Sequence, residues 1–183
     1  PAAVTGLADC QSKLGDTAAA AATLKAHAEA VANDADAAAL RGRVSRELQD
    51  YPEAVSWYEK ANRLRPESTE IKRLLAQAYR LNGQADRAES LKPVVAAGEA
   101  ALAEIRRLNG RLAQEPRNAN LRYRLGELTW RWQSRAEGLN WMRVVLRVDP
   151  RHEAAKRFLA DHDDGQTDAG TTESLALPEM VSD

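Results

Sequence analysis

Small residues recur along this chain with a period of 34 residues, and this period constrains the fold more than any other feature. Ala20, Ala54 and Ala88 are spaced by that period, and Gly138 occupies the corresponding place in a later unit. Two antiparallel helices approach closely only where small side chains face each other. The period therefore predicts repeated helix pairs, each too small to bury its apolar face alone and therefore stacked on its neighbours.

Turn and stop signals fall in the same frame. Gly15 and Gly83 lie between the two helices of a pair, and Pro66 and Pro150 follow the second helix of a pair. Proline ends a helix because it has no N–H to donate and its ring clashes with the preceding turn. The side chains expected to cap helix N-termini are Asp34, Asp50, Ser68 and Ser134.

These residues resemble the tetratricopeptide repeat, in which small residues occupy the eighth and twentieth positions, a large residue the twenty-fourth, and proline a position near the end. The second unit carries Gly42, Ala54, Tyr58, Ala61 and Pro66. The last unit carries Leu125, Gly126, Gly138, Met142, Val145 and Pro150. The resemblance covers residues 1–152 and implies an all-α, right-handed α-solenoid of antiparallel helix pairs.

Two departures from the pattern are visible. Arg41 stands where an apolar residue is expected, and Lys92-Pro93 replaces the large residue of the third unit. The third and fourth units are also offset by more than one period, and the extra residues are apolar at helical spacing. This predicts one long helix over 84–114, kinked near Pro93. The alternative is two shorter helices, broken near Pro93 or Gly98.

The full layout follows from this frame. The units are expected near 1–34, 35–68, 69–118 and 119–152, with a capping helix over 151–161 that completes a repeat domain of residues 1–161. The other helices are expected over 2–14, 17–32, 35–48, 51–64, 68–81, 118–132 and 135–147.

Charge is distributed unevenly along the chain. The net charge is −3 over residues 1–40, +9 over 41–160 and −7 over 161–183. Residues 162–183 are expected to form an acidic, disordered tail with a short apolar segment at 175–178. Across the basic stretch the arginines are mixed with carboxylates and form no continuous basic stripe. Nucleic acid is therefore not an expected partner.

Residues suited to catalysis or metal binding are few. None of the three histidines, His27, His152 and His162, has a metal-ligand partner at helical spacing. The segment 165–172 resembles a phosphate-binding loop but lacks its lysine and a preceding strand. Cys10, the only cysteine, cannot form an internal disulfide and is expected to be buried. We expect no enzyme activity, metal or cofactor, and no membrane span, since no apolar run is long enough.

In the tetratricopeptide family the first helix of each pair lines the concave face. The partner-binding residues that this implies are Arg43, Arg46, Arg73, Gln77, Arg80, Tyr123, Glu127 and Trp130. Their spacing puts the arginines of each helix on one side, and guanidinium groups pair with carboxylates in a fork geometry. An acidic peptide or protein segment is therefore the expected ligand, and Trp130 could stack on it. The alternative is a solvated surface with local ion pairs.

The leading functional hypothesis is a protein–protein interaction module, acting as an adaptor or as a scaffold subunit of a larger complex. One alternative is the regulatory or targeting domain of a larger enzyme, and another is a self-assembling structural subunit that forms homo-oligomers. The acidic tail could fold back onto the arginine face, or serve as a spacer or a docking sequence for another protein.

The high alanine and arginine content favours a bacterial source with a GC-rich genome. The chain begins at Pro1 rather than Met, which leaves the cytoplasm and, after removal of an export signal, the periplasm both open.

Overall fold

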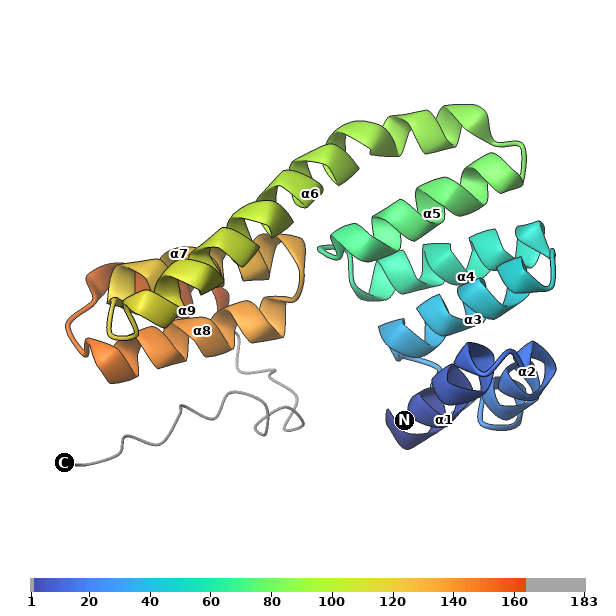
Figure 1. The fold of residues 1–183 in the computed structure, drawn as a ribbon, viewed down its shortest axis with the longest axis horizontal. Coiled ribbons are helices and arrows are strands. Elements are labelled where there is room, and N and C mark those ends of the chain that lie inside the picture. The colour runs from blue at the N-terminus through green and yellow to red at the C-terminus, as the bar shows by residue number, and fades with distance from the viewer. Residues whose placement is uncertain (1, 164–183) are drawn as a thin grey trace.

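The computed structural model describes residues 2–163, which form nine α-helices and no strand. These are α1 (Ala2–Lys13), α2 (Thr17–Ala26), α3 (Ala35–Glu47), α4 (Tyr51–Leu64), α5 (Thr69–Leu81), α6 (Ala85–Gln114), α7 (Ala119–Trp132), α8 (Arg135–Val148) and α9 (Glu153–His162). Figure 1 shows α1–α5 stacked as one group, with α6 extending from this stack to a second group, α7–α9. The predicted all-α solenoid is confirmed.

Small residues lie where the helices of a pair cross, as the period predicted. A Cβ atom on Gly42 would come within 2.9 Å of the Tyr58 ring, and one on Gly138 within 2.2 Å of the Cβ of Trp130. Ala54 is fully buried in the same kind of place. Larger side chains at these positions would push the paired helices apart.

The predicted N-terminal caps are confirmed. Asp34 accepts from the amides of Asp36 and Ala37, at 2.8 and 3.2 Å. Asp50, Ser68 and Ser134 each accept from the backbone N–H three residues later. Each cap satisfies an amide that has no partner within its own helix.

The turns inside the first three pairs also follow the period. Gly15 and Gly83 have φ angles of +87° and +72°, and Gln49, which lies midway between them in sequence, has a φ of +63°. All three residues adopt the left-handed conformation that ends the first helix of a pair. Gln49 does so at a cost, because its Cβ crowds the following carbonyl.

The core is a chain of small clusters, each shared by successive helices. One cluster joins α4, α5 and α6 through Tyr58, Leu75 and Ala88, and another joins α6 and α7 through Ile105 and Leu125. Each helix pair thus buries its apolar face against its neighbours, as expected of a stacked repeat. None of the helices in residues 2–163 is both long and apolar enough to cross a membrane.

Two expectations were wrong. Helix α2 ends at Ala26 rather than near residue 32. The guanidinium of Arg41 donates to the carbonyl of Leu24, the group that would accept from Ala28 if the helix continued, and Ala28 donates instead to Lys25. Cys10 is exposed rather than buried.

Helix α6 is continuous over 30 residues, so the long-helix prediction is confirmed and the alternative of two shorter helices is wrong. It passes through both Pro93 and Gly98. Its first part packs on α5 and its second part on α7 (Figure 1). The division into four units stays a prediction, and the expected tail lies, from residue 164 onward, outside the described residues.

The two groups of helices meet at Gly98. A Cβ atom there would lie 2.2 Å from the hydroxyl oxygen of Thr69, a residue that is 2% exposed. That hydroxyl donates to the backbone carbonyl of Trp132 at 3.0 Å. The start of α5, the middle of α6 and the end of α7 are therefore held together where only glycine fits.

The substitution Gly98→Ala should lower the free energy of unfolding by about 1–3 kcal/mol, because Thr69 is buried and bonded and cannot move aside. The matched control is Gly110→Ala in the same helix, where nothing lies within 4 Å of the new Cβ. That control should gain about 0.5–1 kcal/mol from helix propensity. Urea unfolding of both variants checks this, and equal effects would contradict the close contact.

The substitution Gln49→Gly should stabilise the protein by about 0.5–1 kcal/mol, because glycine adopts a positive φ without the steric cost. Thermal unfolding measures the change. The reverse substitution at the equivalent turn, Gly83→Gln, should destabilise. A destabilised Gln49→Gly variant would mean that the glutamine side chain has a role that outweighs its backbone strain.

Candidate partner-binding site

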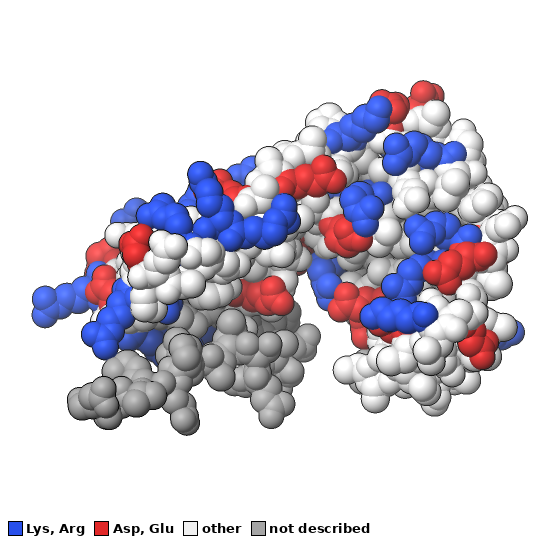
Figure 2. Space-filling view, viewed as in Figure 1, with Lys and Arg blue, Asp and Glu red and all other residues white. Residues whose placement is uncertain are grey.

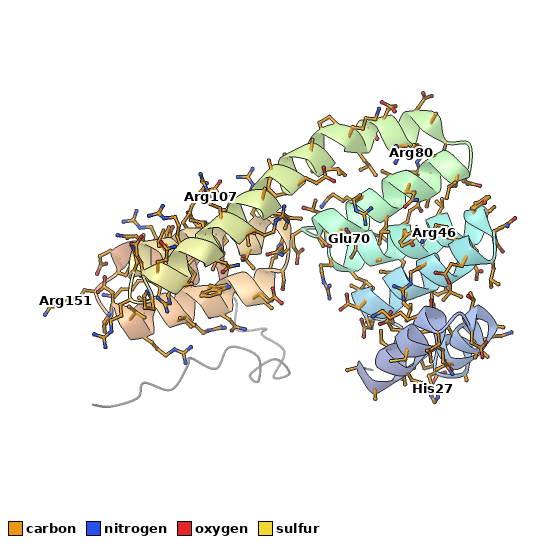
Figure 3. The ribbon with its side chains drawn as sticks, viewed as in Figure 1. His27, Arg46, Glu70, Arg80, Arg107 and Arg151 are labelled. Carbon is orange, nitrogen blue, oxygen red and sulfur yellow. The ribbon has the colours of Figure 1, made fainter. Side chains whose placement is uncertain are left out.

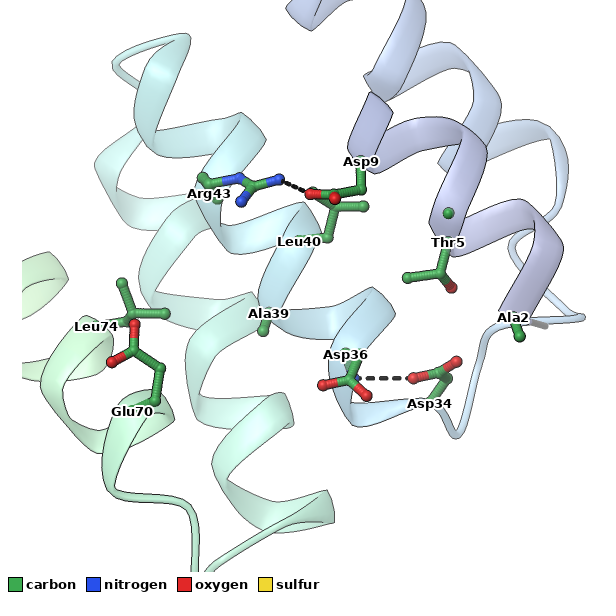
Figure 4. A pocket seen from close by; sticks show the side chains of 11 residues that line it. Ala2, Thr5, Asp9, Asp34, Asp36, Ala39, Leu40, Arg43, Glu70 and Leu74 are labelled. Carbon is green, nitrogen blue, oxygen red and sulfur yellow. Dashed lines mark hydrogen bonds and ion pairs between the residues drawn. The ribbon is translucent and has the colours of Figure 1, made fainter. Parts of the chain in front are cut away.

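A groove lies between the first helices of the first three pairs, α1, α3 and α5 (Figure 4). Its volume is about 510 Å³. Ala39, Leu40 and Leu74 supply its apolar lining, and Thr5 and Gly6 line it from α1. These residues are consistent with the predicted concave face, because they come from the helices that line it in the family.

Carboxylates outnumber cations in the lining of this groove. Asp9, Asp34, Asp36 and Glu70 line it together with one guanidinium, that of Arg43 (Figure 4). The predicted binding residues included the arginines and none of these four acids. Asp9 and Arg43 are 34 residues apart in sequence, so the repeat itself was the signal that they would lie side by side.

Three of these carboxylates form ion pairs within the chain. Asp9 pairs with Lys13 at 2.7 Å and with Arg43. The other two pairs are Asp36 with Arg65, at 2.7 and 2.8 Å, and Glu70 with Arg73. Two of the predicted arginines, Arg43 and Arg73, are thus already neutralised by neighbours. Of the expected ion pairs, to Glu47 and Glu70, the structure shows the one between Arg73 and Glu70.

Asp9 is held in its charged form by its neighbours. Hydrogen bonds from Lys13 and Arg43 lower the pKa of its carboxyl group, and they outweigh the opposing effect of burial. The side chains of Asp9 and Arg43 are each 31% exposed. Solvent therefore screens the pair, and its contribution to stability is modest.

The C-terminal ends of α3 and α5 carry two arginines that are not paired with carboxylates among the described residues. Arg46 and Arg80 are one period apart, on α3 and α5 (Figure 3). Arg46 donates to the neutral side chain of Gln77 at 3.1 Å. Arg80 is exposed and pairs with no carboxylate among the described residues. These two guanidinium groups remain available to an anionic ligand, and we call Arg46, Gln77 and Arg80 the arginine strip.

Two buried donors near the arginine strip lack acceptors within residues 2–163. They are the hydroxyl of Tyr58, which is fully buried against Gly42, and the Nε of Arg43. Burial raises the pKa of Tyr58, while the positive charges of Arg46 and Arg43 lower it, so this hydroxyl lies within their field. Of these two residues, Arg43 lines the groove and Tyr58 does not.

Helix α9 covers the corresponding face of α7. Tyr123 stacks on His152 with ring centroids 5.1 Å apart, and Trp130 meets Phe158 edge-on at 5.5 Å and His162 at 4.5 Å. Tyr123 and Trp130 are only partly exposed as a result. Glu127 forms an ion pair with Arg124 on its own helix. The structure therefore places Tyr123 and Trp130 under the capping helix, apart from the groove, and a role of these two residues and Glu127 in binding stays a prediction.

Charges of both signs are interleaved over the stack of α1–α5, as Figure 2 shows. Within residues 2–163, no group of three or more histidine, cysteine, aspartate or glutamate side chains is placed to hold a metal ion. The chemistry that this face offers is hydrogen bonding and ion pairing to a partner.

Comparison with known proteins shows which repeat family part of this chain matches. A family model for the tetratricopeptide repeat matches residues 35–68, the helix pair α3–α4. This confirms the predicted resemblance for the unit that contains Arg43 and Arg46. None of the curated protein sequences compared with the chain matches it.

Several solved structures are similar to most of this chain. One is YrrB, described as a tetratricopeptide-repeat protein with an unusual peptide-binding site, at 19% identity and a TM-score of 0.49, over 86% of this chain and 90% of that one. MamA from Desulfovibrio magneticus RS-1 is similar at 20% identity and a TM-score of 0.47, over 87% and 81% of the two chains. TTC0263 from Thermus thermophilus is similar at 20% identity and a TM-score of 0.42, over 87% and 79%.

The stability that Asp9 provides should depend on pH. Because its pKa is lower in the folded state, this stability is fully present above the ordinary aspartate pKa and is lost as pH falls through the lowered value. Asp9→Asn should therefore destabilise by less than about 1 kcal/mol at pH 7 and have no effect at the lowest pH that leaves the protein folded. Urea unfolding at both pH values, with Glu29→Gln as an exposed control, measures this. A pH-independent effect would contradict the ion pair.

Proposed function

We propose that this chain is a non-catalytic protein-interaction module that binds an extended segment of a partner protein along the groove between α1, α3 and α5. The observation that carries the proposal is that this groove is open, whereas the equivalent face of α7 is covered by α9. The adaptor or scaffold role that the repeat family implies requires such an uncovered face.

The chemistry of the ligand follows from which charges are already paired. Arg43, Arg73 and the acids of the groove largely neutralise one another. The guanidinium groups of the arginine strip are not neutralised in this way, since Arg46 has a neutral partner and Arg80 has no partner among the described residues. The proposed ligand therefore places a carboxylate over Arg46 and Arg80, where the fork geometry of guanidinium suits it.

The lining of the groove favours an extended peptide segment as the ligand, because it places apolar side chains beside charged ones along three helices. The apolar residues Leu40 and Leu74 offer contact area for one side chain of such a segment. This combination suits a peptide more than a small anion.

Peptides selected on the full-length chain by phage display test this proposal. The selected peptides should be rich in Asp or Glu, and Arg46→Ala/Arg80→Ala should weaken their binding about tenfold or more, because charge-assisted hydrogen bonds are lost. Binding should also weaken as salt concentration rises. Isothermal titration gives the affinities.

The matched control is Arg106→Ala/Arg107→Ala, which removes the same charge from exposed positions on α6. This variant should bind the selected peptides as the unmodified chain does. Equal loss of peptide binding in both double variants would show that the effect comes from net charge alone. Full binding by Arg46→Ala/Arg80→Ala would show that the arginine strip is not the contact surface.

A further inference from the structure

A second hollow lies between the second helices of the first two pairs, α2 and α4, and the helix α3 between them. Its volume is about 340 Å³. Its apolar lining includes Ala21, Leu24, Val44, Leu48 and Trp57. Leu48 is 55% exposed, an unusual degree of exposure for a leucine beside a tryptophan. We call this hollow the α2–α4 trough.

The trough exists because α2 is built almost entirely from alanine. Six of its ten residues are alanine, and Leu24 is its one large apolar side chain. One period later, Val55 on α4 occupies the position of Ala21, and it is buried in the cluster shared by α4, α5 and α6. Alanine leaves that volume empty beside Trp57, and the early end of α2 at Ala26 opens it further.

Cations surround this apolar floor. The guanidinium of Arg41 lies 4.4 Å from the centre of the Trp57 ring, and the amine of Lys60 lies 5.2 Å from it. Lys25 lines the trough from α2. The one carboxylate among the lining residues, Glu53, already accepts from the hydroxyl of Ser45 and the indole N–H of Trp57. The trough is therefore apolar at its base and positive at its edges.

A segment of complementary character lies in the same chain. Residues 173–179 read Glu-Ser-Leu-Ala-Leu-Pro-Glu, with an apolar centre between two acids. Pro178 favours an extended conformation for Leu177. In an extended segment Leu175 and Leu177 point to the same side, while Ala176 points away. Residues 164–183 contain five acids and no base, so their charge opposes that of the trough edges.

We propose that the α2–α4 trough is a docking site for residues 173–179, with Leu175 and Leu177 against Trp57 and the flanking glutamates beside Lys25, Lys60 and Arg41. The chain between Asp163 and Glu173 can span roughly 30 Å when extended. The proposed occupant is therefore the segment of the same molecule. This proposal does not rest on the groove between α1, α3 and α5, which lies on other helices.

The test uses the full-length chain with the substitutions Cys10→Ser and Ser174→Cys, so that a nitroxide spin label sits inside the proposed segment. In the ¹⁵N-labelled protein the indole N–H signal of Trp57, assigned by comparison with Trp57→Phe, should lose most of its intensity. The amide signals of α2 should also weaken. Reduction of the nitroxide should restore all of these signals.

Two further variants separate docking from chance proximity. Leu175→Asp/Leu177→Asp, carrying the same label, should restore the Trp57 signal, and so should Ala21→Leu, which fills the trough. The matched control is Ala22→Leu, because Ala22 is exposed on the same helix; it should leave the broadening unchanged. An equal mixture of ¹⁵N-labelled chains without nitroxide and unlabelled chains with it shows which copy supplies the segment.

The proposal is overturned if the Trp57 signal keeps its intensity. It is also overturned if the broadening persists in Leu175→Asp/Leu177→Asp, or if it is centred on the arginine strip or on the exposed arginines of α6. Because the readout concerns Trp57 and α2 alone, the result is independent of whether the chain binds acidic peptides in its groove.

Discussion

The contact of Gly98 with Thr69 determines how the two halves of the molecule are joined. Helix α6 is the only covalent connection between α1–α5 and α7–α9, and at Gly98 it touches the first turn of α5. The hydroxyl of Thr69 then reaches the carbonyl of Trp132. One glycine therefore allows three helices to converge, and the second group of helices takes its position from that contact. The groove and the trough both belong to the first group.

Local signals made most of the fold predictable. The spacing of small residues, the N-terminal caps and the turn glycines act within one helix pair, so the sequence shows them directly. The end of α2 could not be predicted in this way, because it depends on Arg41 from the following helix reaching Leu24. The substitution of an arginine at a position expected to be apolar was visible in the sequence. Its effect on the end of α2 depends on the neighbouring carbonyl of Leu24, which is a matter of tertiary packing.

The candidate site was predictable as a face but not as a balance of charges. Helical spacing predicted that Arg43 lies on the same side of its helix as Arg46, and Arg73 on the same side as Arg80. It could not show that Arg43 meets Asp9 in the neighbouring repeat, nor that Arg46 meets only a glutamine. Tyr123 and Trp130 fitted the pattern of the family equally well. Their cover by α9 depends on how the end of the stack is closed, which is a property of tertiary packing.

The continuity of α6 has a consequence for how the length of this chain can change. An α-helix turns by about 100° and advances about 1.5 Å for each residue. A single inserted residue between the parts of α6 that contact α5 and α7 would thus swing α7–α9 around the helix axis. An insertion of seven residues, close to two full turns, would nearly preserve the rotational position of α7–α9 about the helix axis. Only certain lengths of α6 would therefore keep the two groups of helices in the same relative orientation.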